Sequence, residues 1–193
     1  MQIKESCLYV ALLRGINVGG NSMVSMKDLK DCFGKLGFRN VSTYINSGNV
    51  IFTSSHKTEQ GLASRIEQGI KKCVGFEVRV VVRSLAEIAA VCKKIPKVWT
   101  HDASSRTDVL FLWKEVDRPS VLSELVINTA VDHLLYVKGA VVWHFDRRDY
   151  NKSKMHKFIG TFVYKNMTAR NVNTVRKLYA LMTQLATGKR RAN

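Results

Sequence analysis

The order of apolar patterns in residues 1–83 is the feature that most constrains how this chain folds. A continuous apolar run at Cys7–Leu13 predicts a buried strand. Apolar residues that recur every three or four positions predict two helices, one starting at Ser25 and one at Thr58. Three further strands are predicted at Val41–Ile45, Val50–Thr53 and Val78–Val82. The resulting order, β-α-β-β-α-β, is that of the split βαβ or ferredoxin-like unit.

The second half of the chain begins with the same order of elements, although its sequence is not a repeat of the first half. A helix entered through Pro119 and a helical stripe from Met155 to Phe162 lie among these strands. A last helix is expected from near Thr168, where a fourth strand would complete the pattern. The strands predicted in this half are Val109–Trp113, His133–Val137 and Val141–Phe145.

We therefore expect an α+β protein built from two ferredoxin-like halves with an extra C-terminal helix. The first half is the domain over residues 1–83. A linking helix, opened by the capping box at Ser84–Glu87, and a polar linker fill residues 84–106. Residues 107–193 form the second domain, with a basic helical end.

Several classes of protein are excluded by simple patterns. No apolar run reaches the roughly 18 residues that a membrane span needs. The histidines show no catalytic spacing with Ser or Cys, but a Cys–His or Ser–His–Asp site stays open, because such partners need not be near in sequence. The cysteines are widely spaced and fall on apolar faces, which indicates reduced core thiols in a cytoplasmic protein. We expect no metal and no cofactor, and whether the chain is an enzyme stays open. The cysteines are Cys7, Cys32, Cys73 and Cys92.

Positive charge is concentrated towards the C-terminus. The chain has 31 Lys or Arg and 15 Asp or Glu, a formal net charge of +16. The stretch Arg147–Asn193 has 12 basic residues and a single acid, Asp149. Just before and within it, His144–Lys154 interleaves basic and aromatic side chains, a composition compatible with phosphate contacts and base stacking. Since Trp143 and Phe145 alternate with His144, one face of this strand is also compatible with simple core burial.

A glycine-rich loop follows the first strand and forms the first candidate site. Its backbone N–H groups, at the start of a helix, suit an anion, although a tight turn that needs glycine explains the same residues. In a split βαβ unit the end of the first strand and the turn between the second and third strands meet at one sheet edge. The candidate ligand-binding residues there are Arg14, Gly15, Asn17, Gly19, Gly20, Asn21, Ser47, Gly48 and Asn49.

The second candidate site lies at the start of the last predicted helix, with Thr168 as its N-cap. Arginine and asparagine in a first helical turn suit phosphate or carboxylate. A solvated polar face, opposite the apolar stripe of the helix, is the alternative interpretation. The candidate residues there are Arg170, Asn171, Asn173 and Lys177, and Lys154 is a further candidate ligand-binding residue outside this helix.

Three motifs resemble those of the bacterial domain-of-unknown-function 1697 family, in the family's order and across nearly the whole chain. They are ALLRGINVGGN (Ala11–Asn21), YINSGNVIF (Tyr44–Phe52) and TARNVNTVRKL (Thr168–Leu178). Ser153 and Lys154 match the family's SK pair, and Val172 stands where the family usually has tryptophan. The resemblance implies an α+β fold with ferredoxin-like halves and no particular activity. The motifs coincide with the two candidate sites.

Two functions from different classes are compatible with these features. The first is binding of an anionic ligand, with RNA favoured, through the basic C-terminal region and the Gly/Asn-rich loop. The second is a small enzyme or sensor for a phosphorylated or carboxylated metabolite, held in a pocket between the two halves. The first is the sequence-based prediction that we carry forward.

Overall fold

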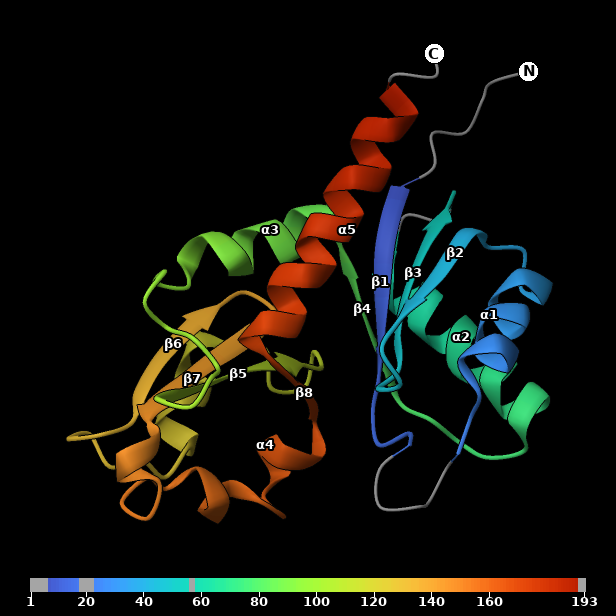
Figure 1. Ribbon diagram of the computed structural model, residues 1–193. Coiled ribbons are helices and arrows are strands. Elements are labelled where there is room, and N and C mark those ends of the chain that lie inside the picture. The colour runs from blue at the N-terminus through green and yellow to red at the C-terminus, as the bar shows by residue number, and fades with distance from the viewer. Residues whose placement is uncertain (1–6, 18–22, 56–57, 191–193) are drawn as a thin grey trace. The chain divides into compact units, whose positions relative to one another are not determined.

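The computed structural model describes residues 7–17, 23–55 and 58–190 (Figure 1). The chain divides into two compact units. Unit 1 takes in Met1–Leu85 and Ala180–Asn193, and unit 2 takes in Ala86–Tyr179. Each unit contains one four-stranded antiparallel sheet.

The sheet of unit 1 has the strand order β2-β3-β1-β4, which is the split βαβ arrangement predicted from the sequence. The third strand lies between the first two and is antiparallel to both. Helices α1 and α2 cover one face of this sheet (Figure 1). The elements are β1 (Cys7–Leu13), α1 (Met26–Lys35), β2 (Arg39–Tyr44), β3 (Asn49–Ser54), α2 (Glu59–Val74) and β4 (Val80–Ser84).

Local sequence signals explain where α1 begins and ends. The Ser25 hydroxyl accepts a hydrogen bond from the Asp28 N–H at 3.0 Å and so caps the first turn. After Lys35 the chain leaves the helix through Gly37, whose φ of +78° is easily adopted only without a Cβ. The helix buries Phe33 against Phe52 of β3, with ring centroids 5.4 Å apart. Burial of one such side chain contributes about 1.5–3 kcal/mol.

The sheet of unit 2 has the order β6-β7-β5-β8, the same topology as unit 1. Its core lies between one face of the sheet and the helical segments η1, η3 and α4. The elements that follow β4 are α3 (Leu85–Lys94), β5 (Ser105–Leu112), η1 (Pro119–Glu124), β6 (His133–Val137), β7 (Ala140–Asp146), η2 (Arg147–Asp149), η3 (Met155–Phe158), α4 (Phe162–Lys165), β8 (Met167–Asn171) and α5 (Val172–Arg190). The part of α5 from Ala180 onward belongs to unit 1.

The fourth strand of unit 2 corrects the prediction that a helix begins near Thr168. Met167–Asn171 pairs with β5 as β8, and α5 begins only at Val172. The predicted capping role of Thr168 was wrong: the Asn171 side chain accepts a hydrogen bond from the Thr174 N–H at 2.8 Å instead. Backbone pairing with a strand some 60 residues earlier decides this structure, and a local pattern does not report such pairing.

Two other predicted helices are shorter than expected. The segment entered through Pro119 is the 3-10 helix η1. The stripe from Met155 to Phe162 divides into η3 and α4, because Gly160 between them has a φ of +87°. Met155 is buried, whereas Phe162 is exposed.

The two predictions of buried residues have different outcomes: the two aromatic residues of β7 are buried, but only one of the four cysteines is fully buried. Trp143 and Phe145 on β7 are both buried in the core of unit 2, as predicted, and His144 between them is buried as well. All four cysteines are free thiols. Cys32 is buried as predicted, and Cys7 and Cys92 are only partly buried. Cys73 on α2 is exposed, so its prediction as a core thiol was wrong.

Candidate functional site

The glycine-rich loop of unit 1 meets the β2–β3 hairpin at one edge of the sheet. The Leu13 N–H donates to the Gly48 carbonyl at 2.8 Å. The Asn17 amide donates to the Asn46 carbonyl at 3.1 Å and to the Val24 carbonyl at 2.9 Å, and its oxygen accepts from the Val24 N–H at 2.8 Å. Asn17 therefore ties the hairpin and the start of α1 to the loop.

Asn49 stabilises the hairpin itself. Its side chain is fully buried and donates to the Tyr44 carbonyl at 3.1 Å and to the Ser47 hydroxyl at 2.9 Å. Amides that form such hydrogen bonds inside the protein have little capacity left for a ligand. In this cluster Gly15 is exposed, Arg14 and Ser47 are half-buried, and Gly48 is buried. Gly19, Gly20 and Asn21 lie outside the described residues.

Arg170 does not lie on a helical face, as the sequence interpretation placed it, but on strand β8. Its guanidinium is buried and donates to the Thr168 hydroxyl at 3.1 Å and to the Ala169 carbonyl at 2.7 Å. Burial lowers the pKa of Arg170 to about 10, which still leaves the side chain charged at neutral pH.

The other residues of the second candidate site have separate roles. Asn171 caps α5, and the exposed Asn173 amide donates to the His101 carbonyl at 2.8 Å. Lys177 is exposed on α5. The backbone N–H of Lys154 donates to a carboxylate oxygen of Asp132 at 2.9 Å. Through these hydrogen bonds, several of the motif residues stabilise the structure of unit 2.

Asp132 organises the Ser153–Lys154 pair. Besides the Lys154 N–H, its buried carboxylate accepts from the Ser153 hydroxyl at 2.5 Å, the Trp143 indole N–H at 2.9 Å and the Asn128 N–H at 2.8 Å. Burial raises the pKa of Asp132, but the four hydrogen bonds together outweigh burial and hold this pKa below the usual 3.8. The Asp132 carboxylate thereby fixes the chain segment that leads into η3.

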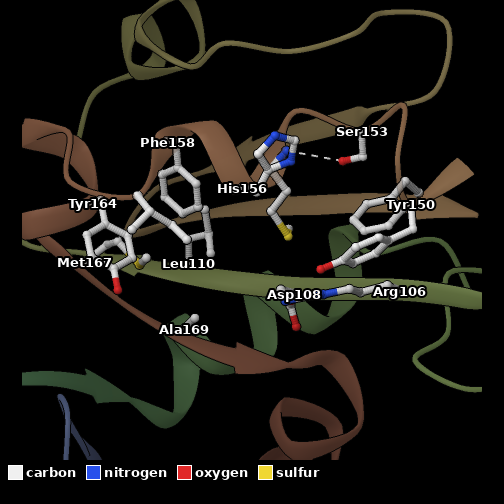
Figure 2. Close-up of a pocket in the computed structure, with 13 residues that line it drawn as sticks. Arg106, Asp108, Leu110, Tyr150, Ser153, His156, Phe158, Tyr164, Met167 and Ala169 are labelled. Carbon is white, nitrogen blue, oxygen red and sulfur yellow. Dashed lines mark hydrogen bonds and ion pairs between the residues drawn. The ribbon is translucent and has the colours of Figure 1, made fainter. Parts of the chain in front are cut away.

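A pocket of about 200 Å³ opens beside this segment in unit 2 (Figure 2). Aromatic and aliphatic side chains form much of it: Leu110 comes from β5, Phe158 from η3 and Tyr164 from α4. The rings of Phe158 and Tyr164 meet edge to face, with centroids 5.4 Å apart. Ala169 of β8 also lines the pocket and is exposed.

The other end of the pocket is polar. Figure 2 shows Arg106 and Asp108 on the opposite side from Phe158 and Tyr164. Arg106 Nε donates to a carboxylate oxygen of Asp108 at 2.7 Å, and His101 Nδ1 lies 3.6 Å from the other carboxylate oxygen. The side chain of Asp108 is only 11% exposed, and that of Arg106 is 33% exposed. The pocket thus presents one cationic donor and one anionic acceptor.

Residues Arg147–Lys157, which we call the basic segment, contribute several side chains to the lining of the pocket. It carries five Lys or Arg residues and one acid, Asp149. Tyr150 in this segment lines the pocket and is 52% exposed. Its ring centroid lies 6.2 Å from that of Phe145. An exposed aromatic ring that lines the pocket therefore belongs to the basic segment.

The basic segment lies within the basic stretch that the sequence shows from Arg147 onward, but the polar end of the pocket was not predicted. The strand was predicted from Val109, whereas β5 begins at Ser105. A detectable signal was present, because Arg106, Asp108 and Leu110 alternate along one face of the strand. Charged residues at the start of an otherwise buried strand indicate a polar site at that sheet edge.

The described residues contain neither a cluster that could hold a metal ion nor a helix that could span a membrane. Among residues 7–17, 23–55 and 58–190, no three His, Cys, Asp or Glu side chains gather closely enough to hold a metal ion. None of the helices in these ranges combines the length and apolar character needed to cross a bilayer.

Comparisons with known proteins are consistent with this fold. Residues 8–143 match the family described as "Protein of unknown function (DUF1697)". The chain is similar to a solved structure, conserved bacterial protein SP0830 from Streptococcus pneumoniae, with 30% sequence identity and a TM-score of 0.78. The similarity covers 92% of this chain and 99% of that one. No curated protein is similar enough to count as a match.

Proposed function

Because the chain belongs to the DUF1697 family, whose description assigns no activity to its members, we propose a function from its own side chains: it binds single-stranded RNA. The observation that carries the proposal is the basic segment, Arg147–Lys157, running beside an aromatic-lined pocket. Proteins that bind single strands combine positive charge along the backbone path with aromatic rings on which bases stack.

The charges of the basic segment are accessible to phosphates. Arg148 pairs with Asp146 at 3.1 Å and Lys152 pairs with Asp149 at 2.8 Å, but these side chains of Arg148 and Lys152 are 81% and 68% exposed. Exposed ion pairs of this kind contribute only about 0–1 kcal/mol. Phosphate groups can therefore replace the carboxylates at small cost.

The predicted site residues of unit 1 have a smaller role in the proposed RNA binding. The amides of Asn17 and Asn49 hold the loop and hairpin of unit 1 together, so we assign the main phosphate contacts to the basic segment. Arg14 in the glycine-rich loop stays a predicted second contact. A cytoplasmic location is also proposed, since the four free cysteines suit a reducing compartment.

The test is a binding titration with a labelled, unstructured single-stranded RNA at several salt concentrations. Affinity should fall with a slope of about −0.7 per phosphate contact in a plot of log K against log salt. The double variant Lys152→Gln/Lys157→Gln should make this slope shallower by about 1.4, since two contacts are lost. Absence of salt-dependent binding by the wild-type protein would refute the proposal.

The matched control removes the same charge elsewhere. Lys27 and Lys30 are both exposed on α1, so Lys27→Gln/Lys30→Gln lowers the net charge equally without touching the basic segment. This control should keep the wild-type slope. Equal effects of the two double variants would mean that the overall net charge drives binding, and that the basic segment has no special part in it.

Arg106 favours a second candidate function. A guanidinium lining a small pocket suits a carboxylate or phosphate group of a metabolite. Thermal-shift measurements with small carboxylates and phosphates test this function, which requires a saturable stabilisation that Arg106→Gln removes. A screen in which no such compound stabilises the protein would contradict it.

A further inference from the structure

The volume of the unit 2 pocket limits what can occupy it. Pockets that bind drug-sized ligands measure about 300–1,000 Å³. The pocket here measures about 200 Å³, so its occupant is a smaller group. A single heterocyclic base belongs to this size class, whereas a whole nucleotide with its sugar and phosphate has to extend beyond the pocket.

The two ends of the pocket match the two kinds of surface on a base. The rings of Phe158 and Tyr164 provide an apolar aromatic surface, as the flat face of a base does. At the opposite end, Arg106 has only donors and Asp108 has acceptors. The edge of a base carries both acceptors and N–H donors, so one base can pair with both side chains.

The exposed aromatic ring at the mouth connects the pocket to the backbone path. Tyr150 lies inside the basic segment, between Arg148 and Lys152, and also lines the pocket. A strand whose phosphates contact this segment would have its bases beside the Tyr150 ring. Stacking on this ring would compensate a base for leaving the stack of its own strand.

Resting on the proposed function, we propose that the pocket accepts one unstacked base of the bound strand. The Tyr150 ring stacks at its mouth, the aromatic side chains surround the base, and the Arg106–Asp108 pair contacts the base edge. The basic segment supplies affinity for any phosphate backbone, and the pocket adds the part of the affinity that depends on bases. Free nucleosides carry the same base chemistry, so the experiment includes them.

The test compares a single-stranded RNA with an abasic strand of equal length, which keeps the phosphates and lacks the bases. Wild-type protein should bind the RNA about tenfold more tightly, or about 1.4 kcal/mol. That difference lies within the range measured for one stacked base. The salt slopes of the two strands should be alike, because the phosphate contacts are shared.

A pocket-filling variant provides the second arm. Ala169 is exposed and lines the pocket, so Ala169→Leu fills space without disturbing the core. It should lower affinity for RNA to that for the abasic strand and keep the salt slope. Ala90→Leu adds the same bulk at an exposed position on α3 and should behave like wild type. Tyr150→Ala should lose affinity for RNA, whereas Tyr150→Phe should retain it.

The outcomes separate this inference from the proposed function. Equal, salt-dependent binding of RNA and abasic strand by the wild-type protein would overturn the base pocket and leave strand binding intact. Failure to bind either strand would refute both. A third outcome is that a free nucleoside binds, that Ala169→Leu abolishes this binding, and that no RNA strand competes with the nucleoside. In that case the pocket serves a free metabolite, and the proposed contact with a strand is wrong.

Discussion

Gly48 offers the sharpest test of how the hairpin packs against the glycine-rich loop. Its φ is +70°, and a Cβ added there would lie 2.8 Å from Leu13 Cβ and 2.9 Å from Ile16 Cδ1. The Ile16 atom ends a flexible side chain and can move. Leu13 Cβ is attached directly to the backbone of β1, so relief of that contact requires the backbone to shift.

Replacement of Gly48 with alanine should therefore lower the free energy of unfolding through two effects. A Cβ in the left-handed region costs about 1–2 kcal/mol. Extra volume forced into a packed site costs about 1–3 kcal/mol. The expected loss is about 2–5 kcal/mol, which corresponds to a fall in Tm of about 4–20 °C for a chain of this size.

Gly15 is a matched control for the close contact. Its φ is +71°, nearly that of Gly48, but no heavy atom of the described residues lies within 4 Å of an added Cβ. Gly15→Ala should cost only the conformational part, about 1–2 kcal/mol. Urea unfolding, followed by circular dichroism, measures both losses. Equal losses for the two variants would refute the argument that Gly48 is required by packing.

Buried polar groups and thiols give three more measurable outcomes. Asp132→Asn should lower the free energy of unfolding by about 1–3 kcal/mol in urea, because the amide leaves a buried donor unpaired. The folded pKa of Asp132 is below 3.8, so the contribution of its carboxylate to the free energy of unfolding is complete above pH 3.8 and is lost as the pH falls through the folded pKa. Asp132→Asn should therefore lose less stability than the wild-type protein on acidification. A thiol reagent should modify the exposed Cys73 first. Burial raises the pKa of Cys32 to about 12 and should protect its thiol from the reagent. A fast phase of modification that persists in Cys73→Ser would contradict this expectation. Asn171→Ala should cost about 0.5–2 kcal/mol by removing the α5 cap, and Asn171→Asp should restore most of it.

Much of unit 1 could be predicted because its signals are local. The apolar run of β1 reflects complete burial of adjacent residues such as Ala11 and Leu12, which point to opposite faces of the sheet. The cap at Ser25 lies within three residues of its partner. The meeting of loop and hairpin followed from the strand order of a split βαβ unit, and the Asn17 hydrogen bond to the Asn46 carbonyl shows it.

Unit 2 contains the features that the sequence did not reveal. Strand β8 exists because its backbone pairs with β5, as in the register of Asp108 opposite Asn171. Arg170 was predicted on a helix and is buried on this strand for the same reason. The charge of the basic segment is visible in the sequence, but the pocket beside this segment was not foreseen.

The class of fold, the starts and ends of several elements, and the concentration of positive charge from Arg147 onward can be inferred from the amino-acid pattern alone. These properties depend on side-chain periodicity and on contacts within a few residues, which a linear pattern records. The position of Arg106 and Asp108 opposite Tyr164 in one pocket, with Tyr150 at its mouth, depends on the folded arrangement and is not visible in the sequence. Those side chains come from segments up to about 60 residues apart, and strand pairing and core packing alone bring them together.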